Sequence, residues 1–507
     1  MPEVMADMNT EPILRVDNLT IDGLLHGISF GLDATHVTSS TSSSRNGTNQ
    51  GARLGLIGES GSGKSLTALS IMGLLPDNLT AAGSIQFAGR ELIGASERSL
   101  RRLRGKKIAM VFQEPMNALD PLMRIGKQLS FTGKDPEDLL ERVMLPKDFT
   151  RRFPHELSGG QRQRVLISMA MAQNPDLLIC DEPTTALDAT TEDEVLTVLD
   201  TLTAEHGTAL LFISHDLAVV KRMCPDIAVM RRGEIVEHGS AEQILNSPQH
   251  AYTQKLVEAS RAALPAHHTT TGETLIQLDN VSKHYRGSIA VDSVSLDVQR
   301  GDRLGIVGGS GSGKTTLLKM IAGLEQPTSG QVSVSGSVQM VFQDPQGSLN
   351  PRLTIGASIA EGLGPGHSLS DDRVRKLVAQ ALEDVGIESH AMNRFPHEFS
   401  GGQRQRISIA RALIGGPDIV LADEAVSALD VSVRNQVLEL LETAVRKHNV
   451  TLLFISHDLA VVRGLCPEVA VMHEGRLVDF GETETIWEHS SDEYTRKLIA
   501  AEKKHAL

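Results

Sequence analysis

The sequence has no apolar run long enough to cross a membrane. A membrane-spanning helix needs about 20 consecutive apolar residues, and no segment of the chain approaches that length. The first residues, MPEVMADMNTEP, also lack the basic and then apolar pattern of a secretory signal. We therefore expect a chain without membrane spans. If it moves a solute across a membrane, the pore must belong to another chain.

Cysteine is scarce, and the charge is predominantly acidic. Three cysteines among 507 residues predict no disulfide framework and fit a reducing cytoplasm. Each lies in apolar sequence, where a small buried side chain is the ordinary interpretation. The formal net charge of −14 argues against a nucleic-acid-binding surface, although an acidic total is compatible with a local basic patch. We expect no nucleic-acid partner.

A set of motifs that occurs twice is the most informative feature present. The pattern GxxxxGK[ST] stands at residues 58–65 and again at residues 308–315, and we call each copy a phosphate loop. Each is followed in the same order by FQ, SGGQ, an apolar run ending in Asp-Glu, ALD and SHD. A chain of this length usually splits into domains. We predict a first domain at 12–262, a linker at 263–274 and a second domain at 275–500.

The spacing between equivalent motifs shows where the two copies differ in length. The phosphate-loop lysines lie 250 residues apart, the FQ glutamines 230, and the SGGQ serines, Asp-Glu pairs and SHD histidines 242. The first copy therefore has 20 extra residues between phosphate loop and FQ, and the second has 12 extra between FQ and SGGQ. The stretch at 33–50, rich in Ser, Thr, Asn and Gly, predicts a surface loop without a core of its own.

The pattern around the motifs predicts an α/β fold. RLGLIG (53–58) and RLGIVG (303–308) read as buried strands that lead into the phosphate loops, and helical sequence follows each. Further apolar strands precede the Asp-Glu pairs and the SHD motifs. Strands that alternate with helices imply a parallel sheet with the ligand at the carboxyl ends of its strands.

The phosphate loops predict ATP and Mg²⁺ as cofactors. Glycines let backbone N–H groups turn onto phosphate oxygens, and the helix that begins there adds the positive end of its dipole. Lys64 and Lys314 are expected to reach the β- and γ-phosphates, while Ser65 and Thr315 offer a hydroxyl to Mg²⁺. One such loop alone could be a Gly-rich loop that happens to contain a lysine, but the recurrence of the loop with the whole motif set makes that alternative negligible. The remaining predicted nucleotide-binding loop residues are Gly58, Ser60, Gly61, Gly63, Gly308, Ser310, Gly311 and Gly313.

Paired carboxylates follow two of the predicted strands. Asp181 and Asp423 end apolar strands, a position suited to holding Mg²⁺. Glu182 and Glu424 come next and can polarise the attacking water. An ordinary acidic strand end would not explain a carboxylate pair at this position in both copies.

The SHD histidines complete the predicted catalytic set. His215 and His457 follow strands, which places an imidazole near the γ-phosphate. A lone histidine here would be interpreted as structural, but the repeated context at the same offset favours function. We therefore predict that Glu182, Glu424, His215 and His457 are the catalytic residues.

The SGGQ motifs supply a second anion site in each copy. A serine and two glycines open the helices QRQRVLISMAMA and QRQRISIARALI, and a helix N-terminus binds anions. Each copy thus has two phosphate-binding surfaces. The residues predicted to bind nucleotide there are Ser158, Gly159, Gly160, Gln161, Ser400, Gly401, Gly402 and Gln403.

These motifs resemble those of ATP-binding cassette (ABC) proteins over about residues 12–260 and 274–500. More narrowly, the chain resembles the dipeptide, oligopeptide and nickel importer ATPases. The narrower resemblance is carried by FQEPMNALDP, FQDPQGSLNP, ISHDLAVV in both copies, DEAVSALD, and the endings SPQHAYTQKL and SDEYTRKL. It implies two tandem P-loop NTPase domains, each a RecA-like core with a helical subdomain, that hydrolyse ATP to drive peptide import.

The resemblance also implies how the sites are assembled. The domains would pair head to tail, so that each phosphate loop meets the SGGQ segment of the other domain. Asp188 and Asp430, in the ALD motifs, would couple the two sites. Gln113 and Gln343, in the FQ motifs, would contact both the nucleotide and the metal. The implied Mg²⁺ set is Ser65, Gln113, Asp181, Thr315, Gln343 and Asp423.

The implied partners are two transmembrane permease subunits, whose cytoplasmic helices would dock near the FQ segments. An external solute-binding protein would act indirectly, and the chain would lie peripherally on the cytoplasmic face of the cell membrane. Relatives often have an aromatic residue that stacks on adenine: the second copy offers Tyr285, while Asp22 and Gly23 stand in the matching place of the first. No cysteine cluster for an iron–sulfur centre is present. The short segment between FQ and SGGQ predicts a reduced helical subdomain in the first copy.

The alternative functions that the sequence leaves open differ in the molecules with which the chain would work. The transported solute could be nickel or another small molecule, because selectivity would lie in the permease and the solute-binding protein. A soluble translation factor of the ABC-F type would have a long charged linker and an LSGGE-like motif. A twin-cassette DNA-repair ATPase would have zinc-binding cysteines, and the FQxP segments argue against a sugar importer. Co-purification with permeases or with ribosomes distinguishes the main alternatives.

Overall fold

A computed structural model of the chain divides into two compact units, with the boundary between Ser260 and Arg261. The structure describes residues 12–32, 51–113, 118–185, 187–261, 272–285, 287–426, 429, 431–448 and 450–504. The predicted loop at 33–50 and Asp430 lie outside the described residues, as does most of the predicted linker. The exact domain limits therefore stay a prediction. Among the described residues, no helix is both long and apolar enough to cross a membrane.

The first unit is built on a six-stranded sheet in the order β10-β9-β3-β8-β7-β6. Its neighbouring strands run parallel except β9 and β10, which are antiparallel. All five residues of β7 and all six of β8 are buried, as expected for strands covered on both faces. The strands are β3 (Arg53–Ile57), β6 (Ile108–Val111), β7 (Leu177–Asp181), β8 (Ala209–Ser214), β9 (Asp226–Arg231) and β10 (Glu234–Ser240).

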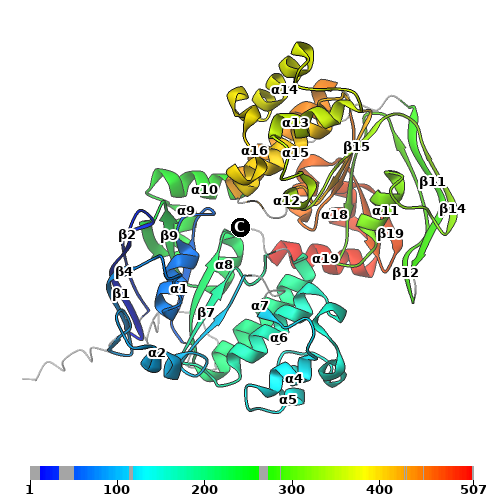
Figure 1. Cartoon of the computed structure of the whole chain (residues 1–507). Helices are drawn as coiled ribbons and strands as arrows, with labels where there is room; N and C mark the ends of the chain where they lie inside the picture. Colours follow the sequence, from blue (N-terminus) through cyan, green and yellow to red (C-terminus); the bar gives the residue numbers. More distant parts are fainter. Residues whose placement is uncertain are drawn as a thin grey trace, which may run out of the picture. The chain divides into compact units, whose positions relative to one another are not determined.

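An antiparallel sheet and a set of helices lie on either side of this sheet (Figure 1). The antiparallel sheet has the order β2-β1-β4-β5, and its apolar residues form one core with α1 and one face of the parallel sheet. The elements are β1 (Leu14–Ile21), β2 (Leu25–Leu32), β4 (Ala81–Phe87), β5 (Arg90–Glu91), α1 (Lys64–Met72), α2 (Glu97–Leu103), α4 (Ile125–Ser130), α5 (Pro136–Arg142), α6 (Gly159–Met171), α7 (Ala189–His206), α8 (Leu217–Met223), α9 (Ala241–Asn246) and α10 (Ala251–Arg261).

The second unit repeats this architecture. Its six-stranded sheet has the order β15-β16-β17-β13-β18-β19, and its antiparallel sheet the order β12-β11-β14. The strands are β11 (Thr274–Tyr285), β12 (Ser288–Gln299), β13 (Arg303–Val307), β14 (Ser329–Val334), β15 (Val338–Val341), β16 (Ile419–Asp423), β17 (Thr451–Ile455), β18 (Glu468–His473) and β19 (Arg476–Glu482). The helices are α11 (Lys314–Ile321), α12 (Pro345–Ser348), α13 (Ile355–Ala360), α14 (Asp372–Asp384), α15 (Gly401–Leu413), α16 (Val431–His448), α17 (Leu459–Leu465), α18 (Thr483–His489) and α19 (Glu493–Lys504).

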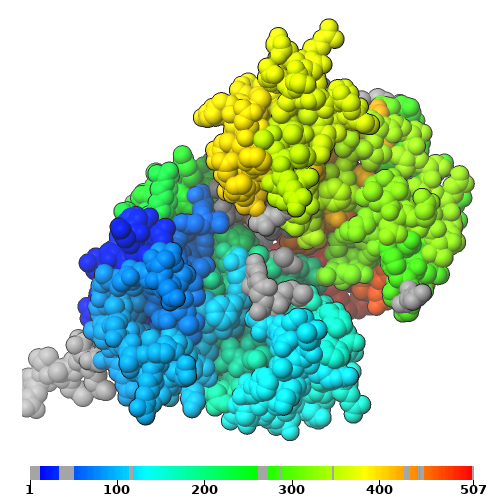
Figure 2. All heavy atoms as spheres, viewed as in Figure 1, coloured from blue at the N-terminus to red at the C-terminus, as the bar shows by residue number. Residues whose placement is uncertain are grey.

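The two copies differ in length in the same two segments that the motif spacing predicts, between phosphate loop and FQ and between FQ and SGGQ. In the first unit β5 and α2 lie between β4 and β6, whereas β14 leads directly to β15 in the second. In the helical layer, α14 has 13 residues and its counterpart α5 has seven. The layer around α13, α14 and α15 has a hydrophobic core of its own and stands out from the rest of its unit in yellow (Figure 2). The smaller helical subdomain predicted for the first copy agrees with this difference.

Each unit has a buried phenylalanine at the equivalent place in its core, and substitution of either should lower the free energy of unfolding. Phe212 on β8 and Phe454 on β17 are fully buried. Replacing either by alanine removes a ring from a close-packed interior, so Phe212→Ala and Phe454→Ala should each lower the free energy of unfolding by about 3–5 kcal/mol. Urea denaturation measures this. Leu122→Ala is the control: Leu122 is 88% exposed, so a comparable loss there would show that burial is not the cause.

Candidate nucleotide site

The predicted site residues lie at the carboxyl ends of four adjacent parallel strands. In the first unit the phosphate loop follows β3, the SHD motif β8, the Asp-Glu pair β7 and the FQ motif β6, and these strands are neighbours in that order. The register makes the ends level, because Ile57 pairs with Ser214 and Asp181 pairs with Ile213. The second unit has the same order with β13, β17, β16 and β15. In each unit, the phosphate loop, the SHD motif, the Asp-Glu pair and the FQ motif therefore lie together at one edge of the sheet.

The phosphate loops need their glycines for two different reasons. Gly61 and Gly63 have φ of 80° and 103°, the left-handed region that glycine adopts without strain. Gly58 is required by close approach instead, since a Cβ there would lie 2.3 Å from the carbonyl oxygen of Met230. α1 begins at Lys64 directly after this turn. The first N–H groups of a helix have no partner within it, which makes the loop suited to phosphate oxygens.

The loop lysines are buried and folded back onto their own loops. Lys64 Nζ donates to the carbonyl oxygens of Gly58 and Glu59, at 2.6 and 3.1 Å. Lys314 makes the same two bonds in the second unit, at 2.7 and 2.9 Å. Burial lowers the pKa of Lys314, and neighbouring carboxylates oppose that shift. A buried ammonium is costly unless polar groups hold it. These carbonyls hold it at the loop, where it can meet an anion.

In the first site, the Glu182 carboxylate contacts the side chains of several other site residues. Its Oε2 accepts from Gln113 Nε2 at 3.1 Å and from Thr185 Oγ1 at 2.9 Å, and lies 3.3 Å from His215 Nδ1. Lys64 Nζ is 4.0 Å from Oε1. Burial acts to raise the pKa of Glu182, but His215, Lys64 and Thr185 outweigh it and lower the pKa to about 2. The carboxylate is therefore ionised at neutral pH.

Glu424 occupies the equivalent place in the second unit. Gln343 Nε2 donates to its Oε2 at 2.7 Å, and His457 Nδ1 lies 3.7 Å from the same oxygen. Burial acts to raise the pKa of Glu424, and the nearby His457 and Lys314 lower it overall. The structure thus brings together the predicted lysine, glutamine, glutamate and histidine in both units.

Both glutamates have backbone conformations that non-glycine residues rarely adopt. Glu182 has φ of 48° and Glu424 has φ of 46°. Their N–H groups donate to the carbonyl oxygens of Ile213 and Ile455 on the adjacent strands, at 2.9 and 3.0 Å. Such a conformation costs about 1–3 kcal/mol and persists where the surroundings fix it. This strain turns the carboxylate out of the strand and toward the site, a feature that the motif alone does not predict.

The predicted metal ligands have chemistry that fits Mg²⁺. Thr315 Oγ1 donates to Asp423 Oδ1 at 3.1 Å. In the first unit Asp181 Oδ1 is buried and has no hydrogen-bond partner among the residues that the structure describes. Burial raises the pKa of Asp181, although the Ser65 hydroxyl opposes it. A carboxylate, a hydroxyl and an amide oxygen are hard ligands of the kind that Mg²⁺ accepts.

The SGGQ segments cap helices. Ser158 Oγ accepts from the N–H of Gln161 at 3.3 Å, and Gln161 Oε1 accepts from the N–H of Ser158 at 3.0 Å. Ser400 and Gln403 form the same capping box at the start of α15. The glutamine carbonyl oxygens of Gln161 and Gln403 therefore also have a structural role, as caps of α6 and α15. Their role toward the nucleotide stays a prediction.

The glycines of the two SGGQ segments differ in surroundings. A Cβ on Gly160 or Gly402 would lie 1.9 Å from Thr191 Cγ2 or 2.6 Å from Val433 Cγ1, so helix packing accounts for these glycines. A Cβ on Gly401 would meet nothing within 4 Å. None of the described residues of its unit requires glycine at that position, and close approach of a ligand is the hypothesis for it.

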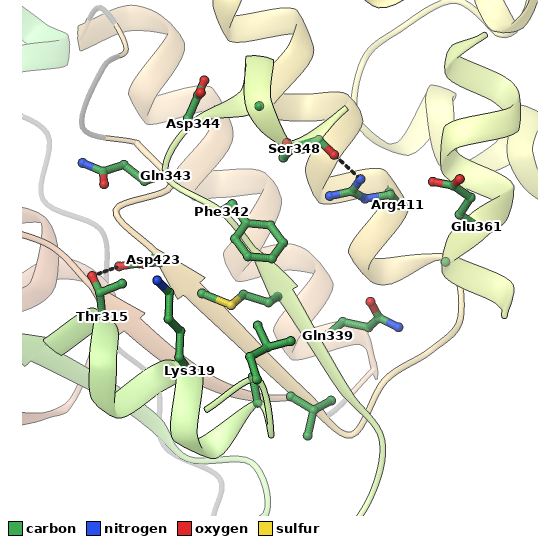
Figure 3. Close-up of a pocket in the computed structure, with 16 residues that line it drawn as sticks. Thr315, Lys319, Gln339, Phe342, Gln343, Asp344, Ser348, Glu361, Arg411 and Asp423 are labelled. Atoms are coloured by element: carbon green, nitrogen blue, oxygen red, sulfur yellow. Dashed lines mark hydrogen bonds between the residues drawn. The ribbon is translucent and has the colours of Figure 1, made fainter. Parts of the chain in front are cut away.

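A groove of about 730 Å³ adjoins the second site. One end is formed by Thr315, Gln343 and Asp423, and the Phe342 ring lies beside it (Figure 3). Farther along, Arg411 Nη1 donates to the carbonyl oxygen of Ser348 at 2.6 Å. The groove therefore joins the predicted metal ligands to the helical layer. It is lined by Thr315, Lys319, Ala322, Leu324, Val338, Gln339, Met340, Phe342, Gln343, Asp344, Gly347, Ser348, Glu361, Gly362, Arg411 and Asp423.

Tyr285 ends β11, and its side chain is 43% exposed. Lys283 Nζ lies 5.3 Å from the centre of its ring. In the first unit Asp22 and Gly23 lie between β1 and β2, in the shorter hairpin. Adenine stacking on Tyr285 stays a prediction.

Sequence reasoning missed three residues of the site. Thr185 donates a hydrogen bond to the Glu182 carboxylate, and the hydroxyls of Tyr252 and Tyr494 contact the phosphate loops. The tyrosines share the 242-residue offset of the signature motifs, a signal that could have identified them.

The His215–Glu182 contact predicts a pH-dependent stability. Burial opposes the charge on His215, but Glu182 raises the pKa of His215 overall. A raised pKa stabilises the fold below the unfolded value of about 6.5, and the gain is lost as pH rises through the folded value. His215→Gln should therefore cost about 1 kcal/mol near pH 6 and less near pH 9. Denaturation at both pH values measures it. His155→Gln, at an exposed histidine, is the control, and a pH-independent cost at His215 would contradict the expectation.

Comparison with protein families gives two matches. The model described as "ABC transporter" matches residues 45–185 and 291–427. The model described as "Oligopeptide/dipeptide transporter, C-terminal region" matches residues 236–284. The first match covers both sets of site residues from the phosphate loop to the Asp-Glu pair, and the second covers α9 and α10.

Comparison with individual proteins agrees. The chain is 40% identical to the peptidoglycan transport ATP-binding protein YejF of Agrobacterium fabrum, over 98% of this chain and 97% of that protein. It is 38% identical to the glutathione import ATP-binding protein GsiA of Salmonella typhimurium, over 89% of this chain and 84% of that protein. Among solved structures it is similar to the archaeal ribosome recycling factor aABCE1, with a TM-score of 0.61, 23% identity and 84% of each chain covered. That last likeness shows the fold alone.

Proposed function

The chain belongs to the ABC transporter family, as an ATP-binding protein with two cassettes, and from this premise we propose that it energises the import of peptides or peptide-like solutes across a membrane. Its reaction is ATP hydrolysis, the activity of ABC cassettes. The peptide class is supported by the match to the oligopeptide and dipeptide transporter C-terminal region. It is also supported by relatives whose names give peptidoglycan transport and glutathione import.

The observation that carries the ATPase proposal is the set of contacts around each catalytic glutamate. Glu182 lies within hydrogen-bond distance of Gln113 and His215, and 4.0 Å from the phosphate-loop lysine. In our proposal the ionised glutamate orients the attacking water, the histidine contacts the γ-phosphate, and Lys64 exchanges its loop carbonyls for phosphate oxygens. Preorganised charge of this kind stabilises the transition state without reorganisation during the reaction.

Mg²⁺ is the second part of the proposal. Ser65 and Thr315 would supply the hydroxyl ligand, Asp181 and Asp423 the acidic one, and Gln113 and Gln343 the amide. The buried Asp181 Oδ1, which has no partner in the described part of the chain, supports this assignment, because an unsatisfied carboxylate oxygen is costly unless a ligand completes it. When bound, the ion would neutralise charge on the β- and γ-phosphates. The pairing of each phosphate loop with the SGGQ segment of the other domain stays a prediction.

We propose permease subunits as the membrane partners, with a solute-binding protein acting through them. The groove beside Phe342 supports this, since it adjoins Gln343 and thus lies next to the catalytic glutamate. A cytoplasmic helix seated there could sense the state of the ATP site. The chain would then be peripheral to the membrane on its cytoplasmic side. Whether the cargo is a peptide, nickel or another solute is set by the permease in this proposal.

Both ATP sites should turn over. Glu182→Gln and Glu424→Gln each remove one water-orienting carboxylate, so each should lower hydrolysis at its own site by about 10²–10³-fold. Steady-state phosphate release from the purified full chain, in which the other site still turns over, should fall by about half in each single variant and by about 10²–10³-fold in the double variant. Glu234→Gln in the first unit and Glu383→Gln in the second, both at exposed glutamates, are matched controls. Full activity in either site variant would contradict the proposal of two active sites.

Membrane association should depend on the permeases. Cells that lack the permease genes should yield the chain in the soluble fraction, and cells that contain them should yield it with membranes. Phe342→Ala should weaken that association because it removes the ring beside the groove, whereas Phe131→Ala, at another exposed phenylalanine, should not. Quantitative blotting of the fractions measures both. Membrane binding without permeases, or sedimentation with ribosomes, would count against import.

A further inference from the structure

A tyrosine hydroxyl contacts the phosphate loop in each unit. In the first, Tyr252 accepts a hydrogen bond from the backbone N–H of Glu59 at 3.2 Å. In the second, Tyr494 accepts from the backbone N–H of Gly309 at 2.7 Å. Glu59 and Gly309 are the second residues of their loops. Each tyrosine is the second residue of the last helix of its unit, α10 or α19 (Figure 1).

The tyrosine rings are held in place by the strand next to the loop. The guanidinium of Arg231, at the end of β9, lies 4.8 Å from the centre of the Tyr252 ring. His473, at the end of β18, stacks on Tyr494 with ring centres 3.8 Å apart and planes 17° apart. Arg231 and His473 are equivalent, because both pairs are 242 residues apart. Two different side chains thus support the same ring in the two units.

The beginnings of the two helices are fixed by hydrogen bonds of their own. Glu237 on β10 accepts from the N–H groups of Gln249 and His250, at 2.7 and 3.0 Å. In the second unit Asp492 accepts from the N–H and the hydroxyl of Thr495, at 2.7 and 3.0 Å. The hydroxyl of each tyrosine is therefore placed by a structure that does not depend on the loop it contacts.

We propose that Tyr252 and Tyr494 are positioning residues that hold the first turn of each phosphate loop in the shape that binds nucleotide. The inference rests on the proposed binding of ATP at these loops. A Gly-rich loop loses much conformational freedom when it orders around phosphate. Because the hydroxyl fixes one loop N–H beforehand, less of that entropy is lost on binding, and the inner N–H groups stay available to the phosphates. The C-terminal helix of each unit thereby contributes to nucleotide affinity without touching the nucleotide.

The second site should depend more on its tyrosine. A Cβ on Gly309 would lie 3.1 Å from the Tyr494 hydroxyl, so the glycine permits the close approach seen there. The first unit has Glu59 at this position and the longer contact. A shorter, better formed hydrogen bond restrains the loop more strongly.

Tyr494→Phe and Tyr252→Phe test the proposal, because each keeps the ring and removes only the hydroxyl. Each is made in the full chain with the other loop disabled, by Lys64→Ala for Tyr494→Phe and by Lys314→Ala for Tyr252→Phe. Equilibrium binding of a non-hydrolysable ATP analogue with Mg²⁺ is measured. The loss of one hydrogen bond should raise Kd about 3- to 10-fold, more at Tyr494 than at Tyr252. The rate at saturating ATP, measured in the same backgrounds, should change less than the KM.

Matched controls separate this role from general stabilisation. Thr485→Val and Ser260→Ala each remove one side-chain hydrogen bond from the C-terminal segments, to Glu482 and to the Leu256 carbonyl oxygen, away from the loops. They should leave Kd unchanged. If Tyr→Phe left Kd unchanged while the parent chain bound the analogue, the positioning role would be wrong and the ATP site would stand. A parent chain that bound no analogue would overturn the ATP site itself. A KM shift that these two controls reproduce would show a structural effect only.

Discussion

A buried lysine ammonium, folded back onto the carbonyls of its own loop, is the interaction on which each cassette depends. Lys64 and Lys314 are buried, and each loop turns the carbonyl oxygens of its first two residues inward to hold the ammonium. That turn requires glycines with positive φ. It also directs the N–H groups of the loop and of the following helix toward the position where phosphate is predicted to bind. The same arrangement that satisfies the lysine creates the anion site. In the proposed function, nucleotide binding would then replace these carbonyl partners with phosphate oxygens.

The sheet determines what else reaches that site. Four neighbouring parallel strands end at one level, so the residues that follow them meet although they are far apart in the chain. The acidic strand end continues into a glutamate with left-handed backbone, and this conformation directs the carboxylate to the glutamine, the histidine and the lysine. The lowered pKa of Glu182 follows from those neighbours, which outweigh its burial. Strand order, backbone strain and charge therefore act together, and the last helix of each unit adds a tyrosine that steadies the loop.

Much of the fold and most of the site could be predicted from the sequence. The repeated motifs gave the α/β class, the strands before the loops and the Glu–His–Gln set, because such chemistry needs fixed residue types at fixed positions. The left-handed Glu182 and Glu424 could not be predicted, since their strain comes from the adjacent strand. The capping role of Gln161 and Gln403 was missed because an amide can serve a helix end or a ligand equally well. Tyr252 and Tyr494 were missed because their contact with the loop is made through tertiary packing.

The central claim is that one chain holds two complete ATP sites, and counting bound nucleotide tests it most directly. The full chain with Glu182→Gln and Glu424→Gln together should retain ATP without cleaving it. Equilibrium dialysis with radiolabelled ATP and saturating Mg²⁺ should give two nucleotides per chain, and adding Lys64→Ala or Lys314→Ala should reduce the number to one. A stoichiometry of one or none in the double glutamine variant would contradict the account.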